Sequence, residues 1–361
     1  MALIKSKFLF FLCLLAFALF GASNAADTKN TVGVFELKKG NFTVKVTNFG
    51  ATIMSVILPD SQGNLADIVL GYDTPEEYAN GTFFFGALVG RVANRIANAQ
   101  FTLDNKTYHL PANDGQNSLH GGIKGFSHLV WTVKESVGGE HPYITFYRRS
   151  VDGEQGYPGD LDVFVTYKLS GDYEFTVDMT AKPVNKATPV NLAQHTYWNL
   201  AGEGSGTILS NTVQISASHI TPVDSQLIPT GELKPVKGTS FDFEEPMNVG
   251  SRIGQVGGGY DINYALNSPV QCNGLRKVAV VTDCKTGRTM ELSSNQVGVQ
   301  FYTSNFLTNW KGKNGHHYPK YSGIALETQG FPNSVNQLSF PSQTVTPGEI
   351  YKHIMVYSFS F

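Results

Sequence analysis

Alternating apolar and polar residues dominate this chain and predict β-strands. Segments rich in Val, Thr, Phe and Tyr have a period of two and are separated by turns of Gly, Asn, Asp and Pro. The clearest of them read FTVKVTNFG (residues 42–50), VFVTYKLS (163–170), EFTVDMTAK (174–182), KVAVVTD (277–283) and HIMVYSFSF (353–361). No repeat, linker or change of composition divides the chain. The pattern predicts an all-β fold, a large antiparallel β-sandwich formed by a single domain over residues 26–361.

Helical patterns are nearly absent. The best candidate is the stretch DTPEEYAN, in which Thr74 is a suitable N-cap, Pro75 suits the first helical position and acidic residues fill the first turn. We expect one or two helical turns there and very little helix elsewhere.

The first 25 residues differ from the rest of the chain. Lys5 and Lys7 precede an apolar stretch, residues 8–20, and small residues follow up to Ala25. This arrangement is typical of a secretory signal peptide, residues 1–25. A retained membrane anchor is the alternative, but roughly 13 apolar residues are fewer than the about 20 that span a bilayer. We therefore expect a secreted protein, extracellular or in a cell wall, without a membrane partner.

Secretion would expose two further groups of residues, the sequon asparagines and the cysteines, to glycosylation and oxidation. Asn41, Asn80 and Asn105 each begin an Asn-x-Thr sequon and are candidate glycosylation sites on exposed loops. Cys272 and Cys284 remain after signal cleavage. The segment LRKVAVVTD between them reads as an extended strand, which would hold the two sulfurs too far apart for a disulfide. Two free thiols are therefore expected.

The charge balance limits the kinds of partner. Without Lys5 and Lys7, 25 basic residues face 29 acidic ones, and charged residues make up only 16% of the chain. No basic cluster supplies the field that neutralises phosphates, so no nucleic-acid partner is expected. These patterns do not encode an oligomeric state, and a monomer is our expectation.

One carboxylate interrupts an apolar run near the C-terminus. Ile324, Ala325 and Leu326 read as a buried strand, and Glu327 follows them shortly before the turn GFP. Glutamate is rarely buried unless it is paired or used chemically. Glu327, placed at the end of this strand, is therefore a candidate to face a pocket.

Three histidine-containing stretches are candidates for chemistry. His120 lies in the polar, glycine-flanked stretch NDGQNSLHGG, where the backbone could approach a ligand closely. His195 lies in NLAQHTYWNL, whose Tyr and Trp could pack on the apolar face of a sugar or could simply fill the core. His316 and His317, in KNGHHYPKY, read as exposed loop residues. For each histidine a structural role is the competing interpretation.

Other polar residues interrupt apolar segments in the same way. Asp261 follows three glycines in GGGYDINYAL, and Gln300 shares a strand face with Tyr302 in VGVQFYTSNF. Asn94 and Arg95 lie within the apolar segment GRVANRIANAQF. A turn acid is the alternative for Asp261, and a solvated or core-paired charge is the alternative for Arg95. Together with the histidines and the glutamate, these side chains suit a neutral, hydroxyl-rich ligand.

Metal and nucleotide sites are not expected from the motifs. The chain contains no HExxH sequence and no cysteine cluster of the kind that binds zinc. It also contains no P-loop and no GxGxxG motif between a strand and a helix.

Six motifs occur in the order GRVANRI, NDGQNSLHGG, QHTYWNL, GGYDINY, VQFYTSNF and ALETQGFPNS. In this order they resemble the aldose 1-epimerases, or galactose mutarotases, over residues 32–361. The resemblance implies a galactose mutarotase-like supersandwich that needs no cofactor and interconverts the α and β anomers of free aldoses such as glucose and galactose. It implies that Glu327 is the catalytic base, His195 the catalytic acid and His120 an orienting residue. The residues implied to bind the sugar are Asn94, Arg95, Asp261 and Gln300.

Three other functions remain open at this point. A glycoside hydrolase would need two carboxylates, for which Glu327 and Asp261 could be proposed. A non-catalytic carbohydrate-binding protein would have lost the base or the acid, and both are present. A hexose-phosphate epimerase should carry an Arg/Lys cluster for the phosphate, and Arg95 is the only such residue among the candidates.

Overall fold

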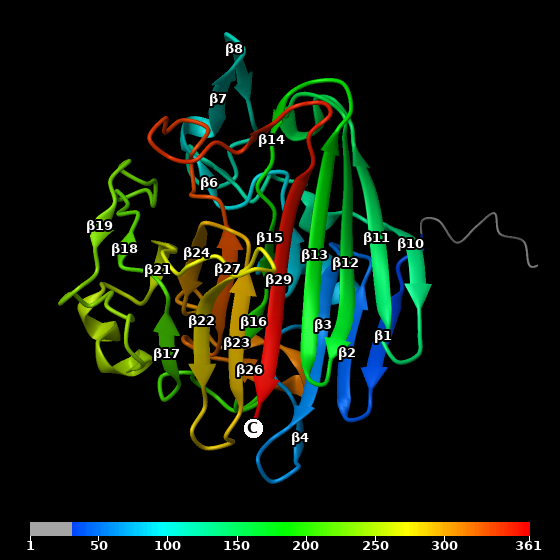
Figure 1. Cartoon of the computed structure of the whole chain (residues 1–361), viewed down its shortest axis with the longest axis vertical. Helices are drawn as coiled ribbons and strands as arrows, with labels where there is room; N and C mark the ends of the chain where they lie inside the picture. The colour runs from blue at the N-terminus through cyan, green and yellow to red at the C-terminus, as the bar shows by residue number, and fades with distance from the viewer. Residues whose placement is uncertain (1–30) are drawn as a thin grey trace, which may run out of the picture.

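Three antiparallel sheets make up most of the computed structural model, which describes residues 31–361 (Figure 1). The expected signal peptide, residues 1–25, lies outside the described residues. A nine-stranded sheet lies in front of a four-stranded and a six-stranded sheet in Figure 1. The predicted all-β, antiparallel fold is therefore confirmed.

The nine-stranded sheet contains the longest strands. In order across the sheet they are β10 (Thr132–Val137), β11 (Tyr143–Ser150), β12 (Leu161–Gly171), β13 (Glu174–Pro183), β29 (Tyr351–Ser360), β23 (Thr289–Ser294), β22 (Arg276–Thr282), β17 (Thr212–Ile215) and β20 (Met247–Asn248). Buried and more exposed residues alternate along β12, β13 and β29. One face of this sheet therefore packs on the core, as the period-two segments predicted.

The other two large sheets lie against that buried face. The four-stranded sheet consists of β1 (Val34–Lys39), β2 (Phe42–Thr47), β3 (Thr52–Pro59) and β4 (Leu65–Asp67). The six-stranded sheet consists of β16 (Tyr197–Trp198), β27 (Ile324–Gln329), β24 (Gly298–Tyr302), β21 (Asp261–Ala265), β18 (His219–Ile220) and β19 (Lys234–Pro235).

Short strand pairs complete the fold. They are β5 (Ala87–Val89) with β15 (Ala193–His195), β6 (Arg95–Ile96) with β9 (Ser118–Leu119), β7 (Gln100–Leu103) with β8 (Lys106–His109), β14 (Thr188–Pro189) with β28 (Thr344–Val345), and β25 (Trp310–Lys311) with β26 (His317–Tyr318).

Aromatic residues join the three large sheets in one core. Phe35 of β1 packs edge-on against Phe146 of β11, with ring centroids 5.7 Å apart. Trp198 of β16 packs against Tyr357 of β29, with ring centroids 4.8 Å apart. Each fully buried large apolar side chain stabilises the fold by roughly 1.5–3 kcal/mol. Because both smaller sheets share this core with the nine-stranded sheet, the six-stranded sheet is a firm support for functional side chains.

Helix is scarce, as predicted. The α-helix of the described chain is α1 (Pro75–Asn80). The Glu77 carboxylate accepts the backbone N–H of Thr74 at 3.1 Å, which is half of a capping box. Short 3₁₀ helices lie at Ala97–Ala99, Phe126–His128, Glu154–Gly156, Val249–Ser251, Ile253–Gln255 and Lys313–Gly315. Within residues 31–361 no helix has the length and apolar character needed to cross a membrane.

The sequon asparagines and the cysteines all lie at the surface. Asn41 lies in the turn between β1 and β2, and Asn105 lies in the turn between β7 and β8. Asn80 is the last residue of α1 and not a loop residue as predicted, but it is exposed. Cys272 and Cys284 lie on either side of β22 and are free, exposed thiols, which confirms the expectation for them.

Candidate active site

Glu327 lies inside a strand and not at its end. β27 continues through Thr328 and Gln329, and all of its residues are buried. The ladder with β24 extends to Gly298, which lies opposite Gln329. The prediction that the strand ends at Glu327 was therefore wrong, because backbone pairing with β24 continues through Thr328, a good strand former, and Gln329.

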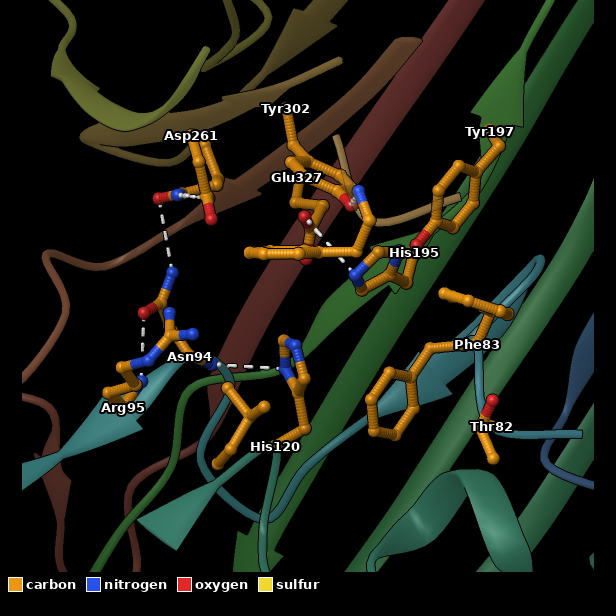
Figure 2. A pocket seen from close by; sticks show the side chains of 14 residues that line it. Thr82, Phe83, Asn94, Arg95, His120, His195, Tyr197, Asp261, Tyr302 and Glu327 are labelled. Atoms are coloured by element: carbon orange, nitrogen blue, oxygen red, sulfur yellow. Dashed lines mark hydrogen bonds and ion pairs between the residues drawn. The ribbon is translucent and has the colours of Figure 1, made fainter. Parts of the chain in front are cut away.

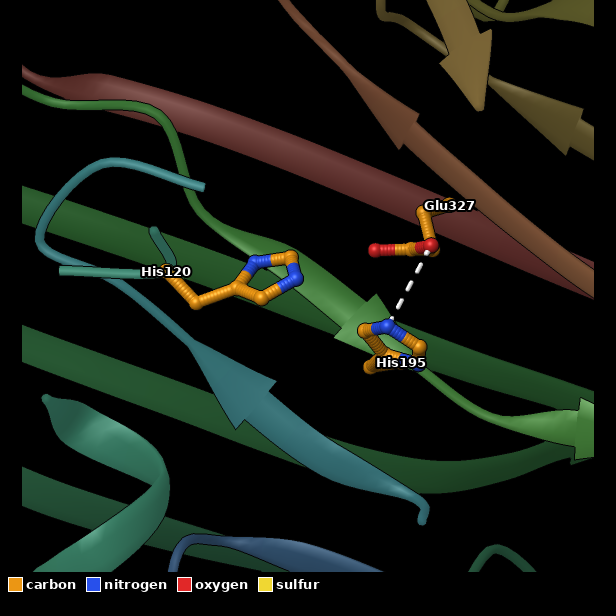
Figure 3. Close-up of side chains that lie close together, drawn as sticks. All are labelled: His120, His195 and Glu327. Atoms are coloured by element: carbon orange, nitrogen blue, oxygen red, sulfur yellow. Dashed lines mark ion pairs between the residues drawn. The ribbon is translucent and has the colours of Figure 1, made fainter. Parts of the chain in front are cut away.

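The strand register brings His195 and Gln300 to either side of Glu327. β24 places Gln300 directly opposite Glu327. On the other side of β27, Tyr197 lies opposite Ala325, and continuing this antiparallel register by two residues brings His195 opposite Glu327. Nε2 of His195 lies 3.5 Å from Oε1 of Glu327 (Figure 3). The two side chains therefore meet, and both are buried.

His120 reaches the same place from a left-handed turn. Its φ is 50°, and Gly121 follows with a φ of 87°. A Cβ on residue 121 would lie 1.9 Å from the carbonyl oxygen of Gly90, so this turn requires glycine. The backbone N–H of Asn94 donates to Nδ1 of His120 at 3.2 Å. The neutral imidazole therefore carries its proton on Nε2, which leaves that nitrogen as the donor for a ligand.

A chain of amide hydrogen bonds fixes the remaining polar residues. Nδ2 of Asn94 donates to Oε1 of Gln300 at 3.1 Å, and Nε2 of Gln300 donates to Oδ1 of Asp261 at 2.6 Å (Figure 2). Nε of Arg95 donates to Oδ2 of Asp114 at 2.7 Å. Because both ends of the Gln300 amide are engaged, its orientation is fixed and Asp261 is held in place.

All the site residues predicted from the motifs line one cavity of about 200 Å³. They are Asn94, Arg95, His120, His195, Asp261, Gln300 and Glu327. Aromatic side chains form much of the remaining wall, including Tyr197 and Tyr302 (Figure 2). The cavity thus has a polar side and an aromatic side, which is how proteins bind the two faces of a sugar ring.

Sequence reasoning missed several residues of this wall. They are Thr82, Phe83, Phe84, Leu119 and Phe306. The run Phe83-Phe84-Phe85 resembles an ordinary buried strand, and nothing in its pattern distinguishes a ring that faces a cavity from one that fills a core. Phe306 is 61% exposed. An exposed phenylalanine beside polar site residues is a signal of ligand contact that only the tertiary structure supplies.

Burial shifts the ionisation of the central residues toward their neutral forms. It raises the pKa of Glu327 well above its ordinary value, and the nearby charge of Asp261 raises this pKa further while Arg95 opposes the shift. It lowers the pKa of His195 to about 4. The pKa of His120 is also lowered, mainly by burial and in addition by His195 and Arg95. The Glu327–His195 pair therefore holds one shared proton over a wide pH range.

Comparison with known proteins agrees with the motifs and with the fold. A model of the aldose 1-epimerase family, described as "Aldose 1-epimerase", matches residues 33–358. The chain belongs to this family. The galactose mutarotases of Mus musculus and Homo sapiens are each 44% identical to it over 332 residues, which cover 91% of this chain and 94% of theirs. The aldose 1-epimerase of Escherichia coli K12 is 34% identical over 323 residues, 88% of this chain and 91% of its own.

A solved structure has the same fold. The aldose epimerase homologue from C. elegans superposes with a TM-score of 0.84 at 29% sequence identity, and the match covers 91% of this chain and 99% of that one. The galactose mutarotase-like fold is therefore established for this member of the aldose 1-epimerase family.

The only described residues that gather three potential metal ligands are His120, His195 and Glu327, whose ligand atoms lie within 4.8 Å of one another. Their surroundings do not suit a metal. Metal-bound histidine usually donates its second N–H to an acceptor. Nδ1 of His120 instead faces the N–H of Asn94, and the buried Nδ1 of His195 has no acceptor among residues 31–361. In this aldose 1-epimerase the cluster is better suited to proton transfer.

His316 and His317 take no part in the cavity. Both are exposed, as predicted, and Nδ1 of His316 lies 2.8 Å from Oε1 of Glu203. These residues therefore serve as surface controls for the buried histidines.

Proposed function

We propose that this chain is an aldose 1-epimerase that interconverts the α and β anomers of free aldoses such as glucose and galactose. Glu327 is the base and His195 the acid in this proposal. The observation that carries it is the buried contact of 3.5 Å between Nε2 of His195 and Oε1 of Glu327 in the wall of a cavity with a polar side and an aromatic side.

The reaction needs two positioned proton transfers. Glu327 takes the proton of the C1 hydroxyl while His195 gives a proton to the ring oxygen, so that the bond from C1 to the ring oxygen breaks and an aldehyde forms. Rotation about the C1–C2 bond and reversal of both transfers then give the other anomer. Each positioned transfer contributes roughly 10²- to 10⁴-fold in rate. This exchange requires one proton on the Glu327–His195 pair, and the pair holds one.

The remaining polar residues orient the sugar in this proposal. His120 supplies a donor at Nε2, and Asn94, Arg95, Asp261 and Gln300 contact the hydroxyls. Binding the ring in one orientation contributes to the rate because the reacting atoms are held close to the acid and the base. No cofactor is needed for these steps.

The competing functions fit the site less well. Among residues 31–361, Arg95 is the only Arg or Lys that lines the cavity, and Asp114 already engages it, so a phosphorylated hexose lacks a phosphate site there. Glu327 is paired with an imidazole and not with the second carboxylate of a glycoside hydrolase. A carbohydrate-binding protein without turnover is the alternative that only an activity measurement separates.

We further propose that the protein enters the secretory pathway and carries glycans at some of Asn41, Asn80 and Asn105. The basic and apolar pattern of residues 1–25 and the exposure of all three asparagines support this. Expression in a eukaryotic secretory host tests both parts. N-terminal sequencing of the protein recovered from the medium tests secretion and signal cleavage, and glycosidase digestion tests glycosylation.

Polarimetry on freshly dissolved α-D-glucose and α-D-galactose tests the enzymatic proposal. The protein should speed relaxation to the same equilibrium rotation, and Glu327→Gln and His195→Asn should each abolish most of this acceleration. Glu349→Gln and His316→Asn are matched controls, because both residues lie outside the cavity and are exposed. A wild-type protein that binds sugar without acceleration would favour the non-catalytic alternative.

A further inference from the structure

The imidazole of His195 is held mainly by aromatic rings. Tyr197 stacks against it with a centroid separation of 5.0 Å and an interplanar angle of 23°. Phe84 stacks at 5.7 Å and 30°, and His120 packs edge-on at 5.2 Å. Nδ1 of His195 is buried and has no hydrogen-bond partner among the described residues. The usual way of orienting a catalytic histidine, an acceptor at its second nitrogen, is therefore absent from this part of the chain.

We propose that Phe84 and Tyr197 are positioning residues, which orient the imidazole of His195 toward Glu327 by ring packing in place of a hydrogen bond. This inference rests on the proposed function, because it assigns the two rings to the acid of that reaction. Neither residue needs to touch the reacting atoms for this role.

Ring packing suits an acid that must protonate a weak base. A carboxylate or carbonyl at Nδ1 would stabilise the imidazolium and so make it a weaker acid. Aromatic packing restricts the ring without adding such an acceptor. The ether oxygen of a pyranose ring accepts a proton reluctantly, so an imidazolium of low pKa is the better donor. Burial lowers the pKa of His195 to about 4, although its own backbone carbonyl works in the opposite direction, and this low pKa agrees with the requirement.

The backbone ties Phe84 to the strand that carries His195. The N–H of Ala87 donates to the carbonyl oxygen of Phe84 at 3.1 Å, which closes a tight turn. Gly86 lies in this turn with a φ of 63°, and its N–H donates to the carbonyl oxygen of His195 at 2.8 Å. A Cβ on residue 86 would lie 1.9 Å from the carbonyl oxygen of Ile53. The local geometry that sets Phe84 over the imidazole is therefore built into β5 and β15.

Steady-state polarimetry of ring-removing and ring-keeping variants tests the proposal. Phe84→Leu and Tyr197→Leu should each lower kcat about tenfold, since a small misplacement of an acid is costly. The KM for glucose should rise as well, because both rings line the cavity, so the fall in kcat is the readout that tests positioning. Phe84→Tyr and Tyr197→Phe, which keep a ring, should recover most of the lost kcat.

Phe101→Leu is the matched control for a purely structural effect. Phe101 is buried, stacks on Tyr108 at 5.4 Å and belongs to a separate core cluster. It should lose stability but keep kcat. The proposal is overturned if both leucine variants keep kcat, or if kcat falls in Phe101→Leu as it does in them.

A second measurement separates this proposal from the proposed function. Two-bond ¹H–¹⁵N NMR of the histidine rings, assigned with His195→Asn, reports whether the His195 ring occupies one environment. One sharp set of signals in the wild type that broadens or doubles in Phe84→Leu and Tyr197→Leu supports positioning. Unchanged signals in both variants overturn it. This result does not depend on turnover, whereas a wild-type protein without mutarotation defeats only the proposed function.

Discussion

Thr328 and His353 meet directly behind the strand that carries Glu327. Oγ1 of Thr328 lies 2.7 Å from Nε2 of His353, and both residues are completely buried. Nδ1 of His353 lies 3.0 Å from the carbonyl oxygen of Leu192, three residues before His195. One histidine of the nine-stranded sheet thus links the segment of the proposed acid to the strand of the proposed base. Burial lowers its pKa to about 3, so it is neutral in the folded protein at neutral pH.

This arrangement predicts that acid weakens the fold well above pH 4. The pKa values of His195 and His353 are about 4 and about 3 in the folded protein, against an ordinary 6.5. At pH values between the folded-state pKa and 6.5, each of these histidines binds more protons in the unfolded chain than in the native one. The free energy of unfolding therefore falls as pH falls below 6.5. Each histidine should remove up to about 2 kcal/mol between pH 6.5 and pH 5. Urea titrations at several pH values measure this slope.

Two variants separate the contributions to that slope. His353→Gln should make the free energy of unfolding fall less steeply as pH is lowered, because the variant lacks one histidine that is protonated only on unfolding. Glu327 works in the opposite direction, because its raised pKa makes the folded state less stable as pH rises above 4.5. Glu327→Gln should therefore steepen the loss on acidification. An unchanged slope in His353→Gln would refute the role assigned to this histidine.

The rate should be nearly flat over a wide pH range and fall on both sides of it. The active form, with Glu327 ionised and His195 protonated, holds the same single proton as the form with neutral Glu327 and neutral His195. Its share of the singly protonated pair is therefore independent of pH. Activity should fall near pH 4, where a second proton binds, and again where the pair loses its last proton. Polarimetric kcat/KM from acid to alkaline buffers checks this, and a rate that rises continuously with pH would indicate a base acting alone.

Gln300→Leu should weaken sugar binding more than it slows turnover. The substitution removes the donor that holds Asp261 and the acceptor that satisfies Asn94. We expect KM to rise about 10- to 100-fold, in line with about 1–3 kcal/mol for a broken buried hydrogen bond. Gln62→Leu, at an exposed turn, is the control. A fall in kcat at unchanged KM would place Gln300 in the chemical step instead.

Removal of metals should leave the activity intact. Within the described part of the chain, His120 and His195 lack the acceptors at Nδ1 that accompany metal-bound histidines, so the cluster they form with Glu327 needs no ion in the proposed reaction. Dialysis against excess EDTA, followed by polarimetry with and without added zinc, tests this. Loss of activity that zinc restores would contradict the prediction.

The sequence predicts the long strands and the central site residues, but it does not predict where every strand ends. The segments now seen as β12, β13 and β29 show their period in the sequence, because one face of each is buried. Glu327 stands out because it interrupts an apolar run, and His195 stands out because Tyr197 and Trp198 follow it closely. The true length of β27 does not stand out, since its pairing with β24, which extends the strand to Gln329, is a long-range contact that the local sequence does not reveal.

Other features depend entirely on long-range contacts. Phe84 lies in an apolar run and is recognisable as a site residue only when the turn at Gly86 places it against His195. The same holds for ionisation, because burial and not composition moves the pKa of His195 to about 4. The pairing of β16 with β27, which brings acid and base together, joins segments that are more than a hundred residues apart.

The location of Glu327 in the interior of β27 has a consequence for heat inactivation. Acid and base both project from paired strands, and neither stands on a loop that could open by itself. Local opening that separates them must break the ladder of β27 with β24 or the ladder of β15 with β5. We therefore expect the loss of activity on heating to coincide with global melting, so that a thermal inactivation curve and a calorimetric transition describe one cooperative event.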